Sequence, residues 1–163
     1  MSNVAEKFDL KSHLVQWLGA LGSFYIKDLR ALPEDQLSKS PGGVAKTPQK
    51  ITAEVIGLCK FATLALRGET SSYTAETDGE PDLSGCDTAD KLAAAYDACA
   101  KALSEAIQNA PDDIWMQEVM PPWQMKDTVF GITNIAINHI WYHDGQINSY
   151  QALLGDDKVH WMD

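Results

Sequence analysis

The chain has 163 residues, of which 45% are hydrophobic and 22% charged, the balance of an ordinary globular protein. This length suits a single domain spanning residues 1–163. The formal net charge of −10 argues against nucleic acid as a partner, because phosphate backbones demand a basic patch, and against docking on anionic membranes.

The three cysteines, Cys59, Cys86 and Cys99, show no CxxC spacing of a zinc or redox motif. We therefore expect free thiols in a reducing compartment. Charged residues occur within 1–10, where a signal peptide would need an apolar run. No apolar stretch reaches the roughly 18 residues of a membrane span, so the expected location is cytoplasmic.

The first predicted helix covers residues 9–31, where apolar residues recur at three- and four-residue steps. Pro33 ends this pattern, and residues 38–46, which include a Ser-Pro-Gly-Gly run, are expected to form a loop. The second helix begins after Thr47, a good N-cap, with Pro48 at its first position.

Gly68 is the expected end of the second helix, and residues 69–86 read as a long exposed connection. An alanine-rich third helix is predicted over 88–109, capped by Asp87 or Thr88.

The fourth helix, over 125–154, is the longest periodic segment and stops at Gly155. No alternating strand pattern is evident anywhere in the chain. Four long helices predict an all-α four-helix bundle.

His139 and His143 are one turn apart on the apolar face of the fourth helix. This spacing places two imidazoles within reach of one metal ion, and binding would keep both rings neutral. The alternative is a pair of core histidines satisfied by polar neighbours such as Gln146 or Tyr150. A metal site also needs a further His, Asp, Glu or Cys from another helix.

The segment His-Ile-Trp-Tyr-His-Asp-Gly-Gln, residues 139–146, with the Tyr-Gln-Ala-Leu-Leu-Gly ending at 155, resembles the last-helix signature of the DinB-like (DNA-damage-inducible) family. The order of helices and loops along nearly the whole chain is similar as well. The resemblance implies a DinB-like bundle with up-up-down-down topology and long connections. It also suits a homodimer, with Trp141 as a candidate contact.

The same resemblance implies a three-histidine site for a divalent metal, usually zinc or nickel, with His139 and His143 as two of the ligands. Gln146 matches the motif glutamine, with a structural or supporting role. Members include metal-dependent hydrolases and transferases that use a low-molecular-weight thiol, so a small-molecule substrate is expected.

Two departures from the family pattern stand out. The third histidine would fall on the second helix, at Cys59 or, with the alignment shifted by one, at Leu58. Cys59 is the candidate third ligand, since a Cys/His₂ set suits zinc, and its alternative role is a small buried hydrophobe. Asp144 replaces the usual arginine and is expected to face solvent.

The other two histidines, His13 and His160, are expected to be peripheral. Two functions are compatible with these residues. The first is a metal-dependent hydrolase or thiol-dependent transferase. The second is a non-catalytic binding or stress-associated protein whose metal site has degenerated, which the missing histidine favours.

Overall fold

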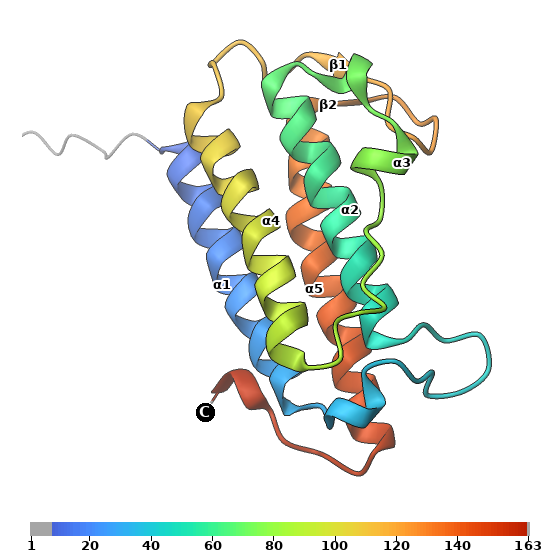
Figure 1. The fold of residues 1–163 in the computed structure, drawn as a ribbon. Helices are drawn as coiled ribbons and strands as arrows, with labels where there is room; N and C mark the ends of the chain where they lie inside the picture. Colours follow the sequence, from blue (N-terminus) through green and yellow to red (C-terminus); the bar gives the residue numbers. More distant parts are fainter. Residues whose placement is uncertain (1–7, 163) are drawn as a thin grey trace, which may run out of the picture.

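The computed structural model describes residues 8–162. Four long helices dominate it: α1 (Leu10–Ala31), α2 (Pro48–Arg67), α4 (Ala89–Asn109) and α5 (Val129–Leu153). They stand side by side in a bundle (Figure 1). Each contacts two of the others: α1 packs against α4 and α5, and α2 packs against the same two, so α1 and α2 lie on a diagonal. The predicted all-α four-helix bundle is confirmed.

Local sequence signals set most helix ends. The side chains of Asp9, Thr47 and Thr88 accept hydrogen bonds from backbone N–H groups of the first turns of α1, α2 and α4. Gly68 ends α2 in the left-handed conformation, with φ of +72°. The predicted boundaries of the second and third helices are therefore confirmed to within a residue.

The fourth helix begins later than its periodicity indicates. Residues Asp127–Thr128 form β2, which pairs antiparallel with β1 (Glu118–Val119), and Thr128 then caps α5 at Val129. The prediction of a strand-free chain was wrong at this point. Strands of two residues contain too little alternation to be read from sequence, and their pairing is a long-range event.

The expected up-up-down-down order was also wrong. Lys11 at the start of α1 bonds the carbonyl of Ala110 beyond the end of α4, so these two helices are antiparallel. Asn148 near the end of α5 bonds Asp28 near the end of α1, so those two run parallel. Relative to α1, helices α2 and α4 run in the opposite direction and α5 runs in the same direction, which is an up-down-down-up order when α1 is taken as up (Figure 1).

The connections explain this order. The segment 32–47, which includes η1 (Glu34–Gln36), turns back at the end of α1, and the Gln49 N–H bonds the Leu37 carbonyl. Only segment 68–88, which includes η2 (Thr70–Ser72) and α3 (Ala75–Asp78), returns along the bundle, and it makes α2 and α4 parallel.

The hydrophobic core is continuous, and a buried polar contact crosses it between two diagonal helices. Tyr25 of α1 and Thr52 of α2 are both buried, and their hydroxyls lie 2.7 Å apart across the bundle diagonal. At the C-terminus, η3 (His160–Met162) folds back on α1, where the Trp161 ring contacts Phe24 and Trp141. No helix within residues 8–162 is long and apolar enough to cross a membrane.

Candidate metal centre between α2 and α5

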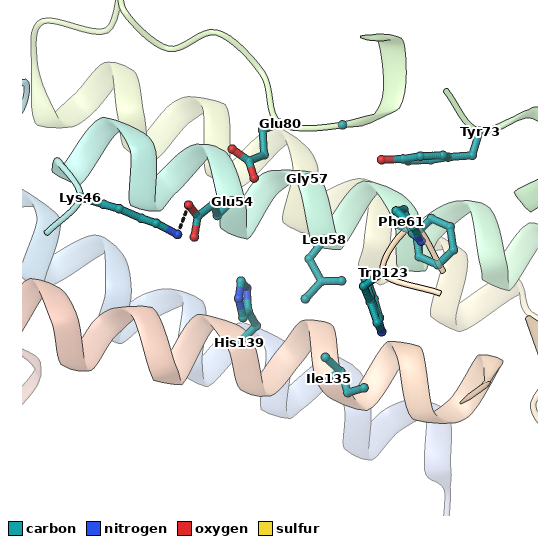
Figure 2. A pocket seen from close by; sticks show the side chains of 12 residues that line it. Lys46, Glu54, Gly57, Leu58, Phe61, Tyr73, Glu80, Trp123, Ile135 and His139 are labelled. Atoms are coloured by element: carbon teal, nitrogen blue, oxygen red, sulfur yellow. Dashed lines mark ion pairs between the residues drawn. The ribbon is translucent and has the colours of Figure 1, made fainter. Parts of the chain in front are cut away.

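A cavity of about 480 Å³ opens between α2 and α5 (Figure 2). One end is charged, with Lys46, Glu54 and Glu80, and His139 faces it from α5. The other end is aromatic. It is lined by Phe61, Tyr73 and Trp123. The cavity therefore offers polar chemistry at one end and an apolar surface at the other, the composition of many small-molecule sites.

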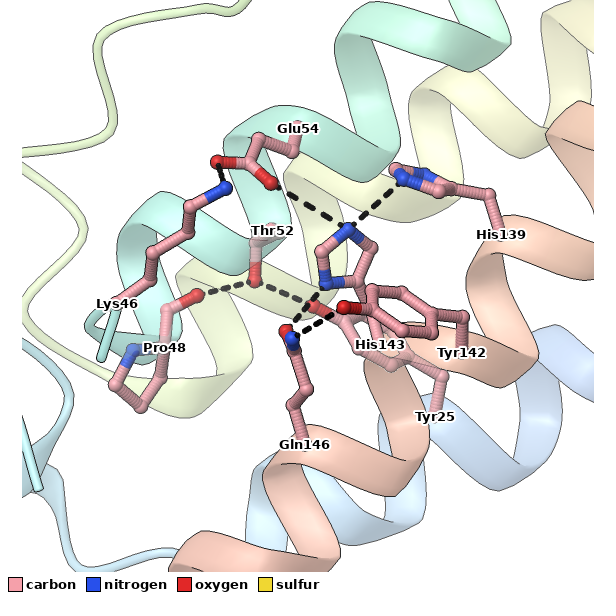
Figure 3. Close-up of polar contacts among 9 residues, drawn as sticks. All are labelled: Tyr25, Lys46, Pro48, Thr52, Glu54, His139, Tyr142, His143 and Gln146. Atoms are coloured by element: carbon pink, nitrogen blue, oxygen red, sulfur yellow. Dashed lines mark hydrogen bonds and ion pairs between the residues drawn. The ribbon is translucent and has the colours of Figure 1, made fainter. Parts of the chain in front are cut away.

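The two histidines of α5 meet beside the charged end. Their Nε2 atoms lie 3.1 Å apart, and the rings are edge-on, with an interplanar angle of 89° (Figure 3). The spacing of four residues produces this contact, because side chains one turn apart lean over the same helix face. His143 is buried, with 1% of its side chain exposed, while His139 lines the cavity.

Gln146 sets the tautomer of His143. Its Oε1 lies 2.8 Å from Nδ1 of His143, and because this oxygen can only accept, Nδ1–H is the donor. The other end of the amide donates to the Tyr142 hydroxyl, at 3.1 Å. A neutral His143 with its proton on Nδ1 directs the lone pair of Nε2 toward His139, which is the form that binds a metal.

Both imidazoles are neutral at pH 7. Burial lowers the pKa of His139 to about 4, and the neighbouring His143 lowers it further in the same direction. Burial likewise lowers the pKa of His143. With the proton of His143 on Nδ1, the Nε2 atom of His143 accepts a hydrogen bond from Nε2–H of His139. The other ring nitrogen of His139, Nδ1, is buried and has no hydrogen-bond partner among the described residues.

Cys59 does not join the histidines. Its side chain is fully buried and interacts with Cys99 of α4, on another face of α2. Leu58 is the residue that lines the cavity together with His139 (Figure 2). Because adjacent residues on a helix point about 100° apart, only one of the two can face α5. The structure therefore does not bring Cys59, the predicted third ligand, to the histidines, and Leu58 has no donor atom to offer.

Glu54 is the α2 side chain that reaches the pair. Its Oε2 lies 3.5 Å from Nε2 of His143, and its Oε1 forms an ion pair with Lys46 (Figure 3). Glu54 lies one turn before Leu58 and so occupies the same helix face. The sequence analysis did not identify Glu54, because the family resemblance predicts the third ligand at residue 58 or 59, one turn later on the same helix.

The donor atoms are of the kind that bind a divalent metal, and two of their separations are close to those of ligands that share one ion. Ligands about 2.1 Å from a tetrahedral ion lie about 3.4 Å from one another, close to the separations of 3.1 and 3.5 Å seen here. Within residues 8–162, however, no three His, Cys, Asp or Glu side chains are placed so that they could hold a metal ion together. For the three side chains to bind one ion, the Glu54 carboxylate, which forms an ion pair with Lys46, would have to move.

Asp144 is not solvated, contrary to expectation. It is 3% exposed and lies against Asp28 of α1, which is fully buried. Burial and the Asp28 carboxyl raise the pKa of Asp144 to about 8. Asp144 follows His143 directly, and adjacent residues on a helix point about 100° apart. His143 faces α2, so Asp144 points toward α1 and lies in the contact between α1 and α5.

The remaining histidines are remote from the cavity. His13 is exposed on α1 and contacts the Phe8 ring, and His160 bonds Asp156 at 2.8 Å. Neither belongs to the cavity lining or to the histidine cluster, as expected.

Comparison with known proteins adds the family. A search of curated proteins finds no match for the chain. The family model described as the DinB superfamily matches residues 26–147, about three quarters of the chain, including α2, α4 and both histidines of α5. Together with the helical bundle and the His139–His143 signature, this match shows that the chain belongs to the DinB superfamily.

Proposed function

We propose that this protein is a metal-dependent hydrolase, with His139, His143 and Glu54 as the groups that would hold zinc or nickel. The observation that supports this most directly is the convergence of two Nε2 atoms and one carboxylate oxygen at the wall of an open cavity. Two histidines and one carboxylate are a set that catalytic zinc uses elsewhere, with a further position left for water.

A bound ion would supply Lewis acidity and lower the pKa of a water molecule at the open position. The chain provides the other functions. Gln146 holds His143 in its binding tautomer, and Glu80, on the cavity wall, is a candidate acceptor for the proton of that water. Phe61, Tyr73 and Trp123 would contact an apolar or aromatic part of the substrate.

Thiol transfer is the second chemistry that this site could support. A low-molecular-weight thiol would bind as a thiolate where the hydrolase would use water. The presence of Glu80 on the cavity wall favours hydrolysis over thiol transfer. A water molecule needs a base to accept its proton, whereas a thiol has a lower pKa and ionises more readily.

A non-catalytic role has one specific observation in its favour. The ion pair between Lys46 and Glu54 neutralises the carboxylate without any metal, and Leu58, one of the two predicted positions of a third ligand, has no donor atom. In that case the cavity would bind a small molecule and the histidines would serve the packing of α5.

Metal analysis distinguishes the two roles. We expect protein from zinc- or nickel-supplemented culture to contain close to one equivalent of metal, measured by elemental analysis after dialysis. His143→Ala and Glu54→Gln should lose it, whereas Glu76→Gln, on the exposed surface of α3, should retain it. Absence of metal from wild-type protein would contradict the enzyme proposal and support the non-catalytic role.

Activity is then tested with the loaded protein. Chromogenic ester and amide substrates with an aromatic group, and an electrophile with a low-molecular-weight thiol, separate hydrolysis from thiol transfer. Glu80→Gln should lower hydrolysis without loss of the metal. Turnover that appears only with the thiol would replace the hydrolase assignment by the transferase.

A further inference from the structure

Two of the three cysteines meet at the contact between α2 and α4. The Cys99 thiol of α4 donates to the backbone carbonyl of Ile56, at 3.5 Å. Side chains of a helix lean toward its N-terminus, so the Cys59 side chain lies over the carbonyl of Ile56, three residues earlier. The sulfur of Cys99 is thereby brought near Cys59, and the two thiols interact electrostatically.

Small residues permit this approach. Ala95, Ala98 and Ala102 line the same groove between α2 and α4 as Cys99. Without long side chains at these positions, the two backbones can come close, and a disulfide needs Cα atoms only about 4.4–6.8 Å apart. The alanine-rich sequence of α4 therefore suits a covalent link between these helices.

The two thiols differ in access and in charge. Cys59 is fully buried in the core, whereas Cys99 is half-buried and lines a surface groove of about 460 Å³ that also contains Lys60. The interaction with Cys59, and then the Lys60 ammonium, lower the pKa of Cys99. The interaction with Cys99, and then burial, raise the pKa of Cys59. The more accessible thiol, Cys99, is thus the nucleophile, and the buried thiol, Cys59, is its proton donor.

We propose that Cys99 and Cys59 form a peroxide-reactive dithiol site that closes to a disulfide between α4 and α2. The Cys99 thiolate attacks a hydroperoxide, the O–O bond breaks, and Cys99 becomes a sulfenic acid while an alcohol or water leaves. The Cys59 sulfur, as it loses its proton, then attacks the Cys99 sulfur, and the hydroxyl group leaves as water. The thiols lose two electrons and the peroxide gains them. This site is independent of the function proposed for the histidines.

Peptide mapping tests the proposal on the intact protein. Trypsin places the three cysteines on separate peptides: Cys59 on 51–60, Cys86 on 68–91 and Cys99 on 92–101. The folded protein is treated with hydrogen peroxide, its remaining thiols are alkylated, and the digest is analysed without reductant. We expect the free thiols to fall from three to one, with peptide 51–60 linked to 92–101, and to return with dithiothreitol.

Single variants assign the two roles. Cys86→Ala, the matched control, should form the same cross-link as wild type. Cys59→Ala should leave a sulfenic acid on Cys99, trapped as a dimedone adduct, while Cys99→Ala should leave Cys59 unreacted. Circular dichroism checks that each variant is helical, and if Cys59→Ala does not fold, the wild-type and Cys86→Ala maps decide alone. Peroxide-treated wild type in which both cysteines remain alkylatable, or in which Cys86 supplies the cross-link, would overturn the proposal.

Discussion

Glu54 Oε2 lies 3.5 Å from Nε2 of His143, and in the neutral tautomer set by Gln146 neither atom has a proton to share. A carboxylate oxygen and an imidazole lone pair repel each other, and a cation near them reduces this repulsion. Lys46 supplies that charge on one side of Glu54, and a divalent ion could supply it on the other. The relationship between Glu54 and His143 therefore makes Glu54 the α2 residue to test as a third ligand of the proposed metal site.

Leu58→His should strengthen metal binding. Leu58 lines the cavity beside His139, and it is one of the two positions at which the family resemblance predicts the third ligand. A third imidazole should tighten zinc binding by roughly tenfold or more, since even groups that only orient ligands change affinity roughly 10–100-fold. Competition with a chromophoric chelator measures this. Cys59→His, which would face α4 instead, is the comparison, and a gain there but not at 58 would contradict the assignment.

Gln146→Leu should weaken metal binding without removing a ligand. The substitution abolishes the acceptor that keeps the proton of His143 on Nδ1, so Nε2 is no longer held as a free lone pair. We expect zinc affinity to fall roughly 10–100-fold, with little change in the melting temperature. Asn138→Leu, an exposed amide on the same helix, is the control. Equal affinities in the two variants would remove Gln146 from the site.

Asp144→Asn should change how stability depends on pH. The pKa of Asp144 is raised from 3.8 in the unfolded chain to about 8 in the fold, so the folded state holds the proton more tightly. The stability of the wild-type protein therefore falls as pH rises between these values, by up to about 1.4 kcal/mol per pH unit. Asparagine cannot ionise, so the variant should lack this slope.

Urea denaturation across this range provides the measurement. The quantity to compare is the unfolding free energy of Asp144→Asn minus that of the wild type. This difference should be larger at about pH 8 than at about pH 5. Asp157→Asn, an exposed carboxylate near the C-terminus, should follow the wild-type curve. Parallel curves for wild type and Asp144→Asn would show that the contact with Asp28 does not retain a proton.

Thr52→Val should destabilise the bundle more than Tyr25→Phe. Valine leaves the buried Tyr25 hydroxyl without its partner, at a cost of about 1–3 kcal/mol. Phenylalanine removes one hydroxyl but leaves Thr52 bonded to the Pro48 carbonyl, so the cost should be about 1 kcal/mol. Urea unfolding of both variants tests the order, and the reverse order would show that Tyr25 acts mainly through ring packing.

Helix ends near strong local signals could be read from the sequence. Thr47, Pro48 and Gly68 enclose α2 as predicted, because a cap satisfies backbone groups within its own turn. The start of α5 could not be read in the same way. It depends on strand pairing between 118–119 and 127–128, which no helical periodicity records.

The sequence by itself determined the helical class, the family signature and the meeting of His139 with His143, since a spacing of four on one helix is a local geometric fact. Only the tertiary structure decided which face of α2 meets α5. A rotation of one residue, about 100°, separates Leu58 from Cys59. That rotation turns Glu54 toward the histidines and Cys59 toward Cys99, and it depends on the packing of the whole bundle.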